Sequence, residues 1–213
     1  MEMPFSPSGA LIKHPFAGLL LGEGPFRESA VPPESGAAFY VNTFRLDDPL
    51  PWKIPAALHS LPEPEDGLPP APEIRWEAPS PDAYAQVFTE IMGQIASGRL
   101  VKSVPATPQF GELQPPHVPR ELIRRAFGSS PSHYPYAWWT EKEGFCGASP
   151  ETLFHQQGRR LTTMALAGTA RPEDEGVFIN DDKEIREHEI VAGSILSRLS
   201  PCCLLYTSDA ADE

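Results

Sequence analysis

Cysteine is scarce in this 213-residue sequence. It occurs three times, and two copies are adjacent at Cys202 and Cys203, a number and spacing that cannot form a disulfide framework. The third, Cys146, stands in an apolar run and is interpreted as a small buried residue. We therefore expect a hydrophobic core to hold the fold, and a chain of 213 residues is long enough to form one.

Long hydrophobic runs are also missing. The run Leu19–Leu21 near the N-terminus is too short for a signal peptide, and no stretch approaches the roughly 20 apolar residues of a membrane span. We expect a soluble, cytoplasmic protein with no membrane partner.

Positive charge is in short supply. The sequence has 17 Lys and Arg against 29 Asp and Glu, for a formal net charge of -12. Binding to nucleic-acid phosphates requires clustered Lys and Arg, so we expect no nucleic-acid partner. A small anionic ligand remains compatible with this charge, because a divalent cation held by carboxylates can bridge two negative partners.

The pattern along the chain predicts short strands and a few helices. Residues 61–80 are rich in proline and acids and predict an extended, solvated connector. Ser80 and Pro81 are typical of a helix N-terminus and Gly98 of a helix end. Further helices are expected over residues 118–127 and from Asp181 or Asp182 onward. Strands are expected over residues 10–12, 18–21, 38–44, 100–110, 134–140, 144–148, 152–155 and 161–166.

Lys102 is the first candidate for site chemistry. It shares a predicted strand face with Leu100 and Val104. It therefore lies at a sheet edge, extends its charge to solvent, or points into a cavity. In a cavity, desolvation would lower the pKa of its ammonium and let it act as a base.

Acidic and turn residues supply the other candidates. Glu151 follows Pro150 between apolar runs. A carboxylate in such a place is paired, binds a metal or is protonated with a raised pKa. The alternative is an ordinary acidic residue in a surface turn. Glu187 and His188 lie one turn into the last predicted helix, where an i,i+4 ion pair with Lys183 is the structural alternative to a metal site. Gly168–Thr169 offers backbone N–H groups and a hydroxyl to a carboxylate, or forms only a turn.

Four motifs occur in one order: GRLVKSVPA, GFCGASPETLF, TTMALAGTAR and DDKEIREHEIV. Together they resemble the chorismate-binding enzyme family, which includes isochorismate synthases, salicylate synthases, the large subunit of anthranilate synthase and aminodeoxychorismate synthase. The resemblance covers residues from about Gly98 to Leu199. It implies an α+β fold of largely antiparallel sheets with helices packed outside.

The resemblance also implies a domain organisation. We expect residues 1–78 to be a shortened or divergent N-terminal region, rich in strands and proline, and residues 79–200 to be the N-terminal portion of the chorismate-binding catalytic domain. Residues 201–213 resemble translated adapter sequence and are expected to be non-native. The family's C-terminal half, with a second Mg²⁺ carboxylate and substrate-gripping Arg and Tyr, is then missing, so we expect the 213-residue chain alone to be inactive.

Three differences within the family predict the reaction. Members that add ammonia usually carry Gln at the position of Lys102, whereas members that add water use a lysine there as the base. Ala167 stands where one branch of aminodeoxychorismate synthases has a nucleophilic lysine. The stretch EHEIVAGSILSRL lacks the Leu-x-Arg-Asn-Asp pattern of amine-adding enzymes. The resemblance therefore implies an isochorismate synthase-like isomerase of menaquinone or siderophore biosynthesis.

By this resemblance, the enzyme converts chorismate to isochorismate by Mg²⁺-dependent water addition with loss of the ring hydroxyl. Lys102 deprotonates the water, and Glu151, with a raised pKa, is the general acid for the departing hydroxyl. Glu187 is a ligand of the Mg²⁺ that holds the ring carboxylate. The pocket is lined by Ala167, Gly168, Thr169 and His188.

Two other interpretations stay open. One is the large component of an anthranilate or aminodeoxychorismate synthase, which adds ammonia to chorismate and needs a glutamine amidotransferase subunit as partner. The other is a non-catalytic binding module that uses the Pro-rich N-terminal half as an interaction surface. The first predicts an amine product only when ammonium is supplied, and the second predicts that Lys102→Ala and Glu151→Gln leave turnover unchanged.

Overall fold

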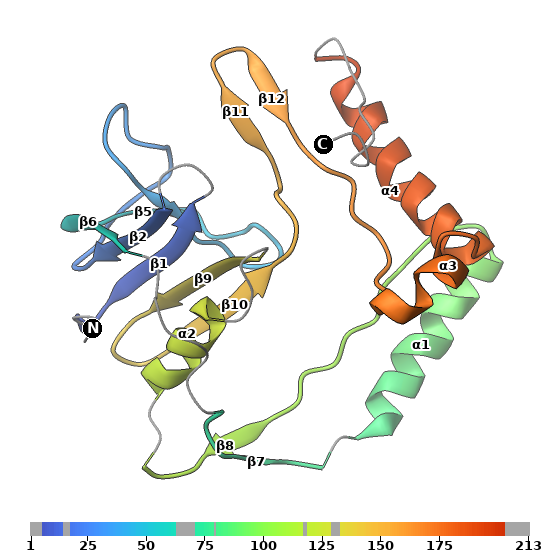
Figure 1. Ribbon diagram of the computed structural model, residues 1–213, viewed down its shortest axis with the longest axis horizontal. Helices are drawn as coiled ribbons and strands as arrows, with labels where there is room; N and C mark the ends of the chain where they lie inside the picture. The colour runs from blue at the N-terminus through green and yellow to red at the C-terminus, as the bar shows by residue number, and fades with distance from the viewer. Residues whose placement is uncertain are drawn as a thin grey trace. The chain divides into compact units, whose positions relative to one another are not determined.

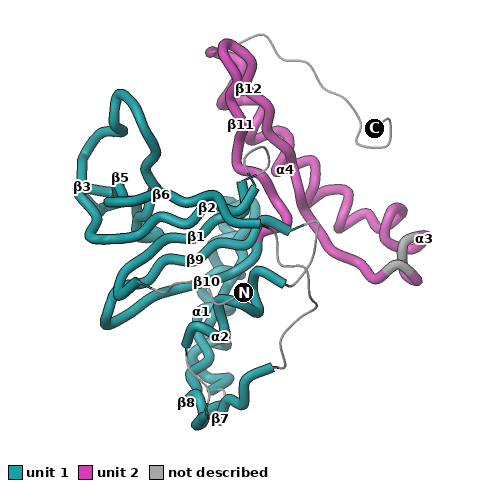
Figure 2. The backbone as a smooth tube through the Cα atoms, turned by 60° about the vertical axis from the view of Figure 1, so that its left-hand side comes forward, with its two compact units in different colours: residues 1–148 teal, residues 149–213 magenta. Residues whose placement is uncertain are grey.

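A computed structural model describes residues 6–14, 18–62, 71–78, 80–116, 119–128 and 133–202. The chain divides into two compact units, residues 1–148 and residues 149–213 (Figure 2). The predicted division near residue 79 rests on the family resemblance rather than on compactness, and it stays a prediction.

A five-stranded sheet organises the first unit (Figure 1). β1 pairs antiparallel with β2 on one side and with β9 on the other, and β2 continues antiparallel to β6. The strand order is β10-β9-β1-β2-β6, with bounds Gly144–Ser149, Tyr134–Trp139, Gly9–His14, Gly18–Glu23 and Ala57–Leu61. Four of these five strands confirm predicted ones, because their apolar runs are bounded by turn residues.

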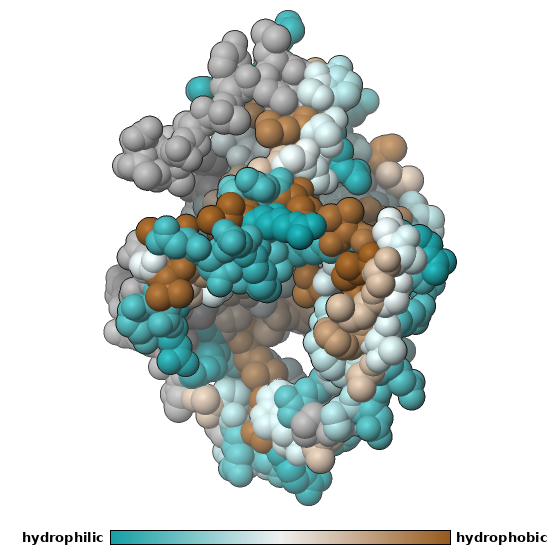
Figure 3. Space-filling view, turned by 90° about the vertical axis from the view of Figure 1, so that its right-hand side faces the viewer, coloured by the Kyte–Doolittle hydropathy of each residue, from teal (hydrophilic) through white to brown (hydrophobic). Residues whose placement is uncertain are grey.

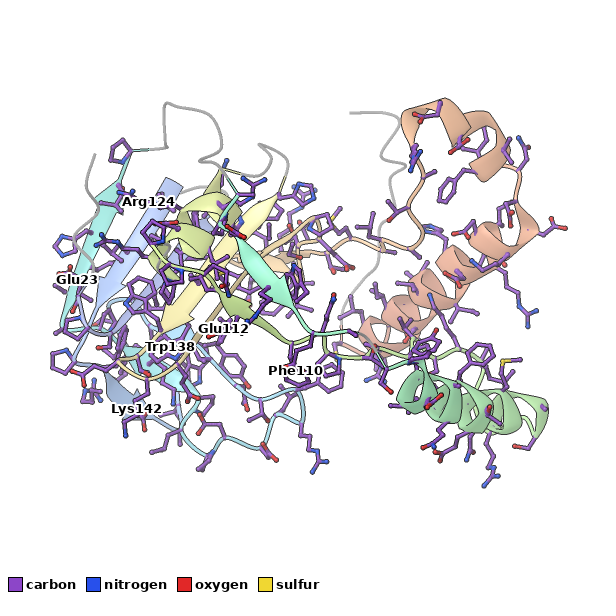
Figure 4. The ribbon with its side chains drawn as sticks, turned by 90° about the horizontal axis from the view of Figure 1, so that it is seen from below. Glu23, Phe110, Glu112, Arg124, Trp138 and Lys142 are labelled. Carbon is purple, nitrogen blue, oxygen red and sulfur yellow. The ribbon has the colours of Figure 1, made fainter. Side chains whose placement is uncertain are left out.

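The core of this unit forms on one face of the sheet. Alternation places Leu11, Leu21 and Ala137 on that face, where cross-strand pairing sets them side by side. The helix α2 (Pro119–Phe127) covers them and adds Ile123 to the same buried cluster. Burial of each large aliphatic side chain contributes about 1.5–3 kcal/mol to stability. On β9, Trp138 (labelled in Figure 4) packs its ring 4.6 Å from that of Phe26.

A second, three-stranded sheet contains a buried lysine. Its order is β3-β5-β4, with bounds Arg27–Ser29, Trp52–Ile54 and Phe39–Tyr40. Lys53 on β5 donates to Glu28, to Asp48 and to the Leu50 carbonyl at 2.8–3.0 Å. Burial by itself lowers the pKa of Lys53, but the hydrogen bonds to Glu28 and Asp48 outweigh it and hold the pKa above its usual value. The strand predicted over residues 38–44 is shorter in the structure, where β4 covers only Phe39–Tyr40.

The helix α1 (Pro81–Ala96) ends as its sequence predicts. Gly98 has φ +72° and donates to Ile95 O, while Arg99 N donates to Gln94 O, which together close the helix with a left-handed glycine. At the other end Ser80 is the N-cap residue, but its hydroxyl makes no capping hydrogen bond. β7 (Ile74–Trp76) and β8 (Gly111–Leu113) pair as a two-stranded ribbon. In the sequence, α1 and the segment that follows it lie between these two strands.

One prediction in this part of the chain is wrong, and a second is made more specific. Residues 100–110 form no strand; they run irregularly from α1 to β8. Pro105 and Pro108 remove two backbone donors from this segment, so it cannot complete a hydrogen-bonded ladder. The connector predicted over residues 61–80 contains the strand β7, while residues 63–70 and 79 lie outside the described part.

The described residues of the second unit form a hairpin and three helical segments. β11 (His155–Gln157) pairs antiparallel with β12 (Arg160–Thr162), so the strand expected over residues 152–155 lies further along the chain and the one over 161–166 is shorter. The turn η1 (Pro172–Asp174), α3 (Glu175–Phe178) and α4 (Asp182–Leu199) follow. Asp181 caps α4, since its side chain accepts from Lys183 N at 2.8 Å and Glu184 N at 3.3 Å.

Apolar side chains reach the surface in both units, as brown areas among teal ones (Figure 3). On α1 they include Tyr84, Val87, Phe88 and Met92. No described helix has the length and apolar character that crossing a membrane requires. The antiparallel sheets and helices confirm the predicted α+β class.

Candidate functional site

The predicted site residues are divided between the two units. Lys102 belongs to the first. The second contains the remaining six, which are Glu151, Ala167, Gly168, Thr169, Glu187 and His188.

Lys102 lies just beyond the closing turn of α1. Leu100 N bonds to Gln94 O at 3.3 Å, so the segment that carries Lys102 is attached to the end of the helix. The lysine is half-buried. Its position is therefore set by a helix end and an irregular segment, and the predicted strand contributes nothing to it.

Glu151 lies in the turn after β10 and is exposed to solvent. The Ser149 hydroxyl donates to the Glu151 carbonyl at 3.1 Å and accepts from the Glu151 N–H at 3.3 Å. This local turn fixes the backbone and leaves the carboxyl group outside. Within the second unit Glu151 thus has the surface-turn placement that the sequence allowed as one alternative.

The Ala167–Thr169 segment packs against the beginning of α4. Gly168 has φ +81°, a conformation that side chains strongly disfavour. A Cβ atom at Gly168 would come 2.5 Å from a Glu184 carboxylate oxygen and 2.6 Å from the Phe178 ring. Only glycine therefore allows this close approach of the Ala167–Thr169 segment to Glu184 on the first turn of α4. Ala167 is half-buried and Thr169 exposed.

Charged side chains gather on that first turn. Lys183 Nζ lies 2.6 Å from Glu184 Oε1 and 3.7 Å from Glu187 Oε1. The second contact is the predicted i,i+4 ion pair, which is confirmed. The hydrogen bond to Glu184, with the charges of Glu184 and Glu187, raises the pKa of Lys183. His188, the next residue, is exposed.

Sequence reasoning missed Glu184 and Phe178 as neighbours of the Ala167–Thr169 segment, which is called the pocket segment because its residues are the predicted pocket residues. A usable signal existed for Glu184, because it precedes Glu187 by three residues and such residues share a helix face. Phe178 gave no such signal, since its contact with Gly168 depends on the turn that joins α3 to α4.

The donor set can be tested against the implied Mg²⁺. Among the described residues, no three or more His, Cys, Asp or Glu form a cluster that could hold a metal ion. Mg²⁺ is usually held by one or two carboxylates and completes its shell with water and ligand oxygens. Glu187, beside Glu184, fits such a partial set, and the two carboxylates already share one cation, the Lys183 ammonium.

The described chain is an α+β protein of antiparallel sheets and helices. Its candidate site for an anion and a cation lies where the Gly168 segment packs against the first turn of α4. Residues 53–212 match the family model described as "Chorismate binding enzyme". The chain therefore belongs to the chorismate-binding enzyme family. The matched interval continues past Pro201 into the segment predicted to be non-native, and that prediction stays a prediction.

A solved structure shows the same fold. It is described as a 2,3-dihydroxybenzoate-specific isochorismate synthase, DhbC, from Bacillus anthracis, and is 18% identical with a TM-score of 0.66. The match covers 97% of this chain, and the chain spans 64% of the length of that structure. No curated protein matches the chain.

Proposed function

We propose that these residues belong to an isochorismate synthase-like enzyme, an isomerase that converts chorismate to isochorismate. Water adds to one ring carbon and the hydroxyl on another departs as water, so the elemental composition of the substrate is unchanged. The reaction needs a base at the incoming oxygen and an acid at the leaving one. Since the chain spans 64% of the similar structure, the proposal concerns the enzyme that contains these residues.

Lys102 is the proposed base and Glu151 the proposed acid. Lys102 takes a proton from water as the oxygen attacks the ring, and Glu151 gives its proton to the departing hydroxyl. Lys102 is half-buried. By the family resemblance, a lysine at this position favours water over ammonia as the nucleophile.

Substrate binding is assigned to the second unit. Ala167, Gly168 and Thr169 offer backbone N–H groups and a hydroxyl, and His188 lies on the adjoining helix. Glu187 is proposed as one ligand of Mg²⁺, which, when bound, would balance the charge of the ring carboxylate. The observation that carries the site is the contact of Gly168 with Glu184, one helical turn before Glu187.

Product analysis tests the proposal. The enzyme is incubated with chorismate and Mg²⁺, with and without ammonium. We expect isochorismate in both reactions. An amine formed only with ammonium would contradict the proposal and favour the amidotransferase-dependent alternative, whereas salicylate would indicate a further pyruvate-lyase step. The same assay on the 213-residue chain tests whether it is inactive alone.

Two variants test the residue roles. We expect Lys102→Gln and Glu151→Gln each to lower kcat by about 10²–10⁴-fold, the usual contribution of a general acid or base. Lys142→Gln is the matched control, because Lys142 lies exposed in the turn between β9 and β10 (Figure 4). If neither test variant changes turnover relative to the control, the catalytic assignment is wrong.

A further inference from the structure

We propose that Lys183 is a resident counter-cation of Glu187 that competes with the divalent metal for this carboxylate and weakens metal binding until the substrate arrives. The inference rests on the proposed function, because it takes Glu187 as a metal ligand. It goes beyond that function by assigning to Lys183 a role in controlling how tightly Glu187 binds the metal.

The geometry gives Lys183 two carboxylate partners on one helix turn. Its ammonium is 2.6 Å from Glu184 and 3.7 Å from Glu187. Of the two, Glu184 is the better anchored, since its side chain is only 19% exposed and one of its oxygens lies over Gly168. Lys183 is thereby tethered beside Glu187 by its contact with Glu184.

The positive charge of Lys183 opposes the binding of a metal ion at Glu187. A divalent ion at Glu187 would approach an ammonium that lies 3.7 Å from the same oxygen, so the lysine must turn away before the ion binds. The Lys183 side chain is 71% exposed, and exposed ion pairs of this kind are weak because solvent screens them. Displacement is therefore easy, and the lysine acts as a weak competitor.

The substrate changes this balance. Its ring carboxylate adds negative charge and ligand oxygens, both of which strengthen binding of the metal. Lys183 stays paired with Glu184, so its positive charge still offsets part of the negative charge of this helix turn after the metal has bound. The site would then bind the metal weakly without substrate and more tightly with it, and this difference couples metal binding to substrate binding.

Metal binding without substrate gives the primary test. Mn²⁺ is used as the probe and its free fraction is followed by electron paramagnetic resonance, on the enzyme preparation shown to convert chorismate with Mg²⁺. We expect Lys183→Met to tighten Mn²⁺ binding by roughly 2–5-fold. Arg186→Met is the matched control, since it removes one positive charge from an exposed position on the same helix; its effect should be clearly smaller.

Chemical labelling gives a second measurement in the unaltered protein. The acylation rate of Lys183, read by mass spectrometry, should rise when Mg²⁺ is added, because the lysine loses one of its two partners. Lys142 serves as the internal reference and should not change.

Each result separates the inference from the proposed function. Equal tightening in Lys183→Met and Arg186→Met, with no change in Lys183 labelling, overturns the inference and leaves the proposed function standing. Failure of Glu187→Gln to weaken Mn²⁺ binding overturns the metal role of Glu187 itself, and the inference falls with it. Specific tightening in Lys183→Met together with faster labelling supports both.

Discussion

Lys53 shows how a single charged side chain can hold a small sheet together. It is 6% exposed, and its three hydrogen bonds join β5 to Glu28 on β3 and to the loop that carries Asp48 and Leu50. A buried charge is tolerated only when it is paired and hydrogen-bonded. All three ammonium donors are used here, so the cluster is satisfied.

Replacing this lysine should therefore be costly. We expect Lys53→Met to lower the free energy of unfolding by about 1–3 kcal/mol, because two carboxylates lose their charged partner. Urea denaturation measures the change, with Lys142→Met as the surface control, expected within about 0.5 kcal/mol of the parent. A loss no larger than that of the control would show that the cluster adds nothing to stability.

Asp48 in the same cluster predicts a pH effect. The hydrogen bond from Leu50 N and then that from Lys53 hold the pKa of Asp48 below its usual value. A lowered folded-state pKa stabilises the protein above the unfolded-state value, and this contribution is lost as the pH falls through the folded-state value. The Tm of the parent should therefore exceed that of Asp48→Asn at neutral pH, and the gap should narrow below about pH 4. A gap independent of pH would contradict this.

Sequence reasoning reached some residues of these clusters and missed others for a physical reason. The Lys183–Glu187 pair was predictable because a helix fixes neighbours four residues apart. Lys53 and Glu28 are 25 residues apart and meet only through the pairing of β3 with β5. Local patterns hold no information about such a contact.

At the scale of elements, the two long helices differ in how they begin. Asp181 accepts two hydrogen bonds from the first turn of α4, whereas Ser80 makes none for α1. We expect Asp181→Ala to cost about 0.5–2 kcal/mol in unfolding free energy and Ser80→Ala much less. Thermal unfolding followed by circular dichroism compares them; equal losses would show that the Asp181 cap is not what stabilises α4.

Gly168 connects the pocket segment to α4 and allows a second matched comparison. Gly168→Ala adds a Cβ into Glu184 and Phe178, whereas Gly158→Ala meets nothing within 4 Å, although Gly158 also has a positive φ of +59°. Both variants should lose about 1–2 kcal/mol through the backbone, but only Gly168→Ala should also displace the pocket segment, with a roughly tenfold or greater loss of kcat/KM. Equal activity in the two variants would exclude a positioning role for the contact.

Helices were more predictable from the sequence than strands. α1, α2 and α4 lie close to their expected bounds, because caps and amphipathic spacing are local signals. The strand expected over residues 100–110 is absent, since a strand also needs a partner and two prolines weaken this one. That error matters for the site, because it changes what positions Lys102.

At the scale of the whole molecule, four ordered motifs were enough to identify the family, and the match of residues 53–212 confirms it. The reaction rests on fewer residues. The proposed base, Lys102, and the proposed acid, Glu151, belong to different units, and both roles are assigned from the family motifs rather than from a local pattern of the sequence. Family membership is therefore established, while the choice of water as nucleophile depends on Lys102.

The origin of the new hydroxyl tests that choice most directly. The enzyme is incubated with chorismate and Mg²⁺ in water enriched in oxygen-18, and the product is analysed by mass spectrometry. Water addition predicts isochorismate that carries one oxygen-18 atom, with the label absent from unreacted chorismate. Unlabelled isochorismate, or an amine product when ammonium is present, would contradict the account.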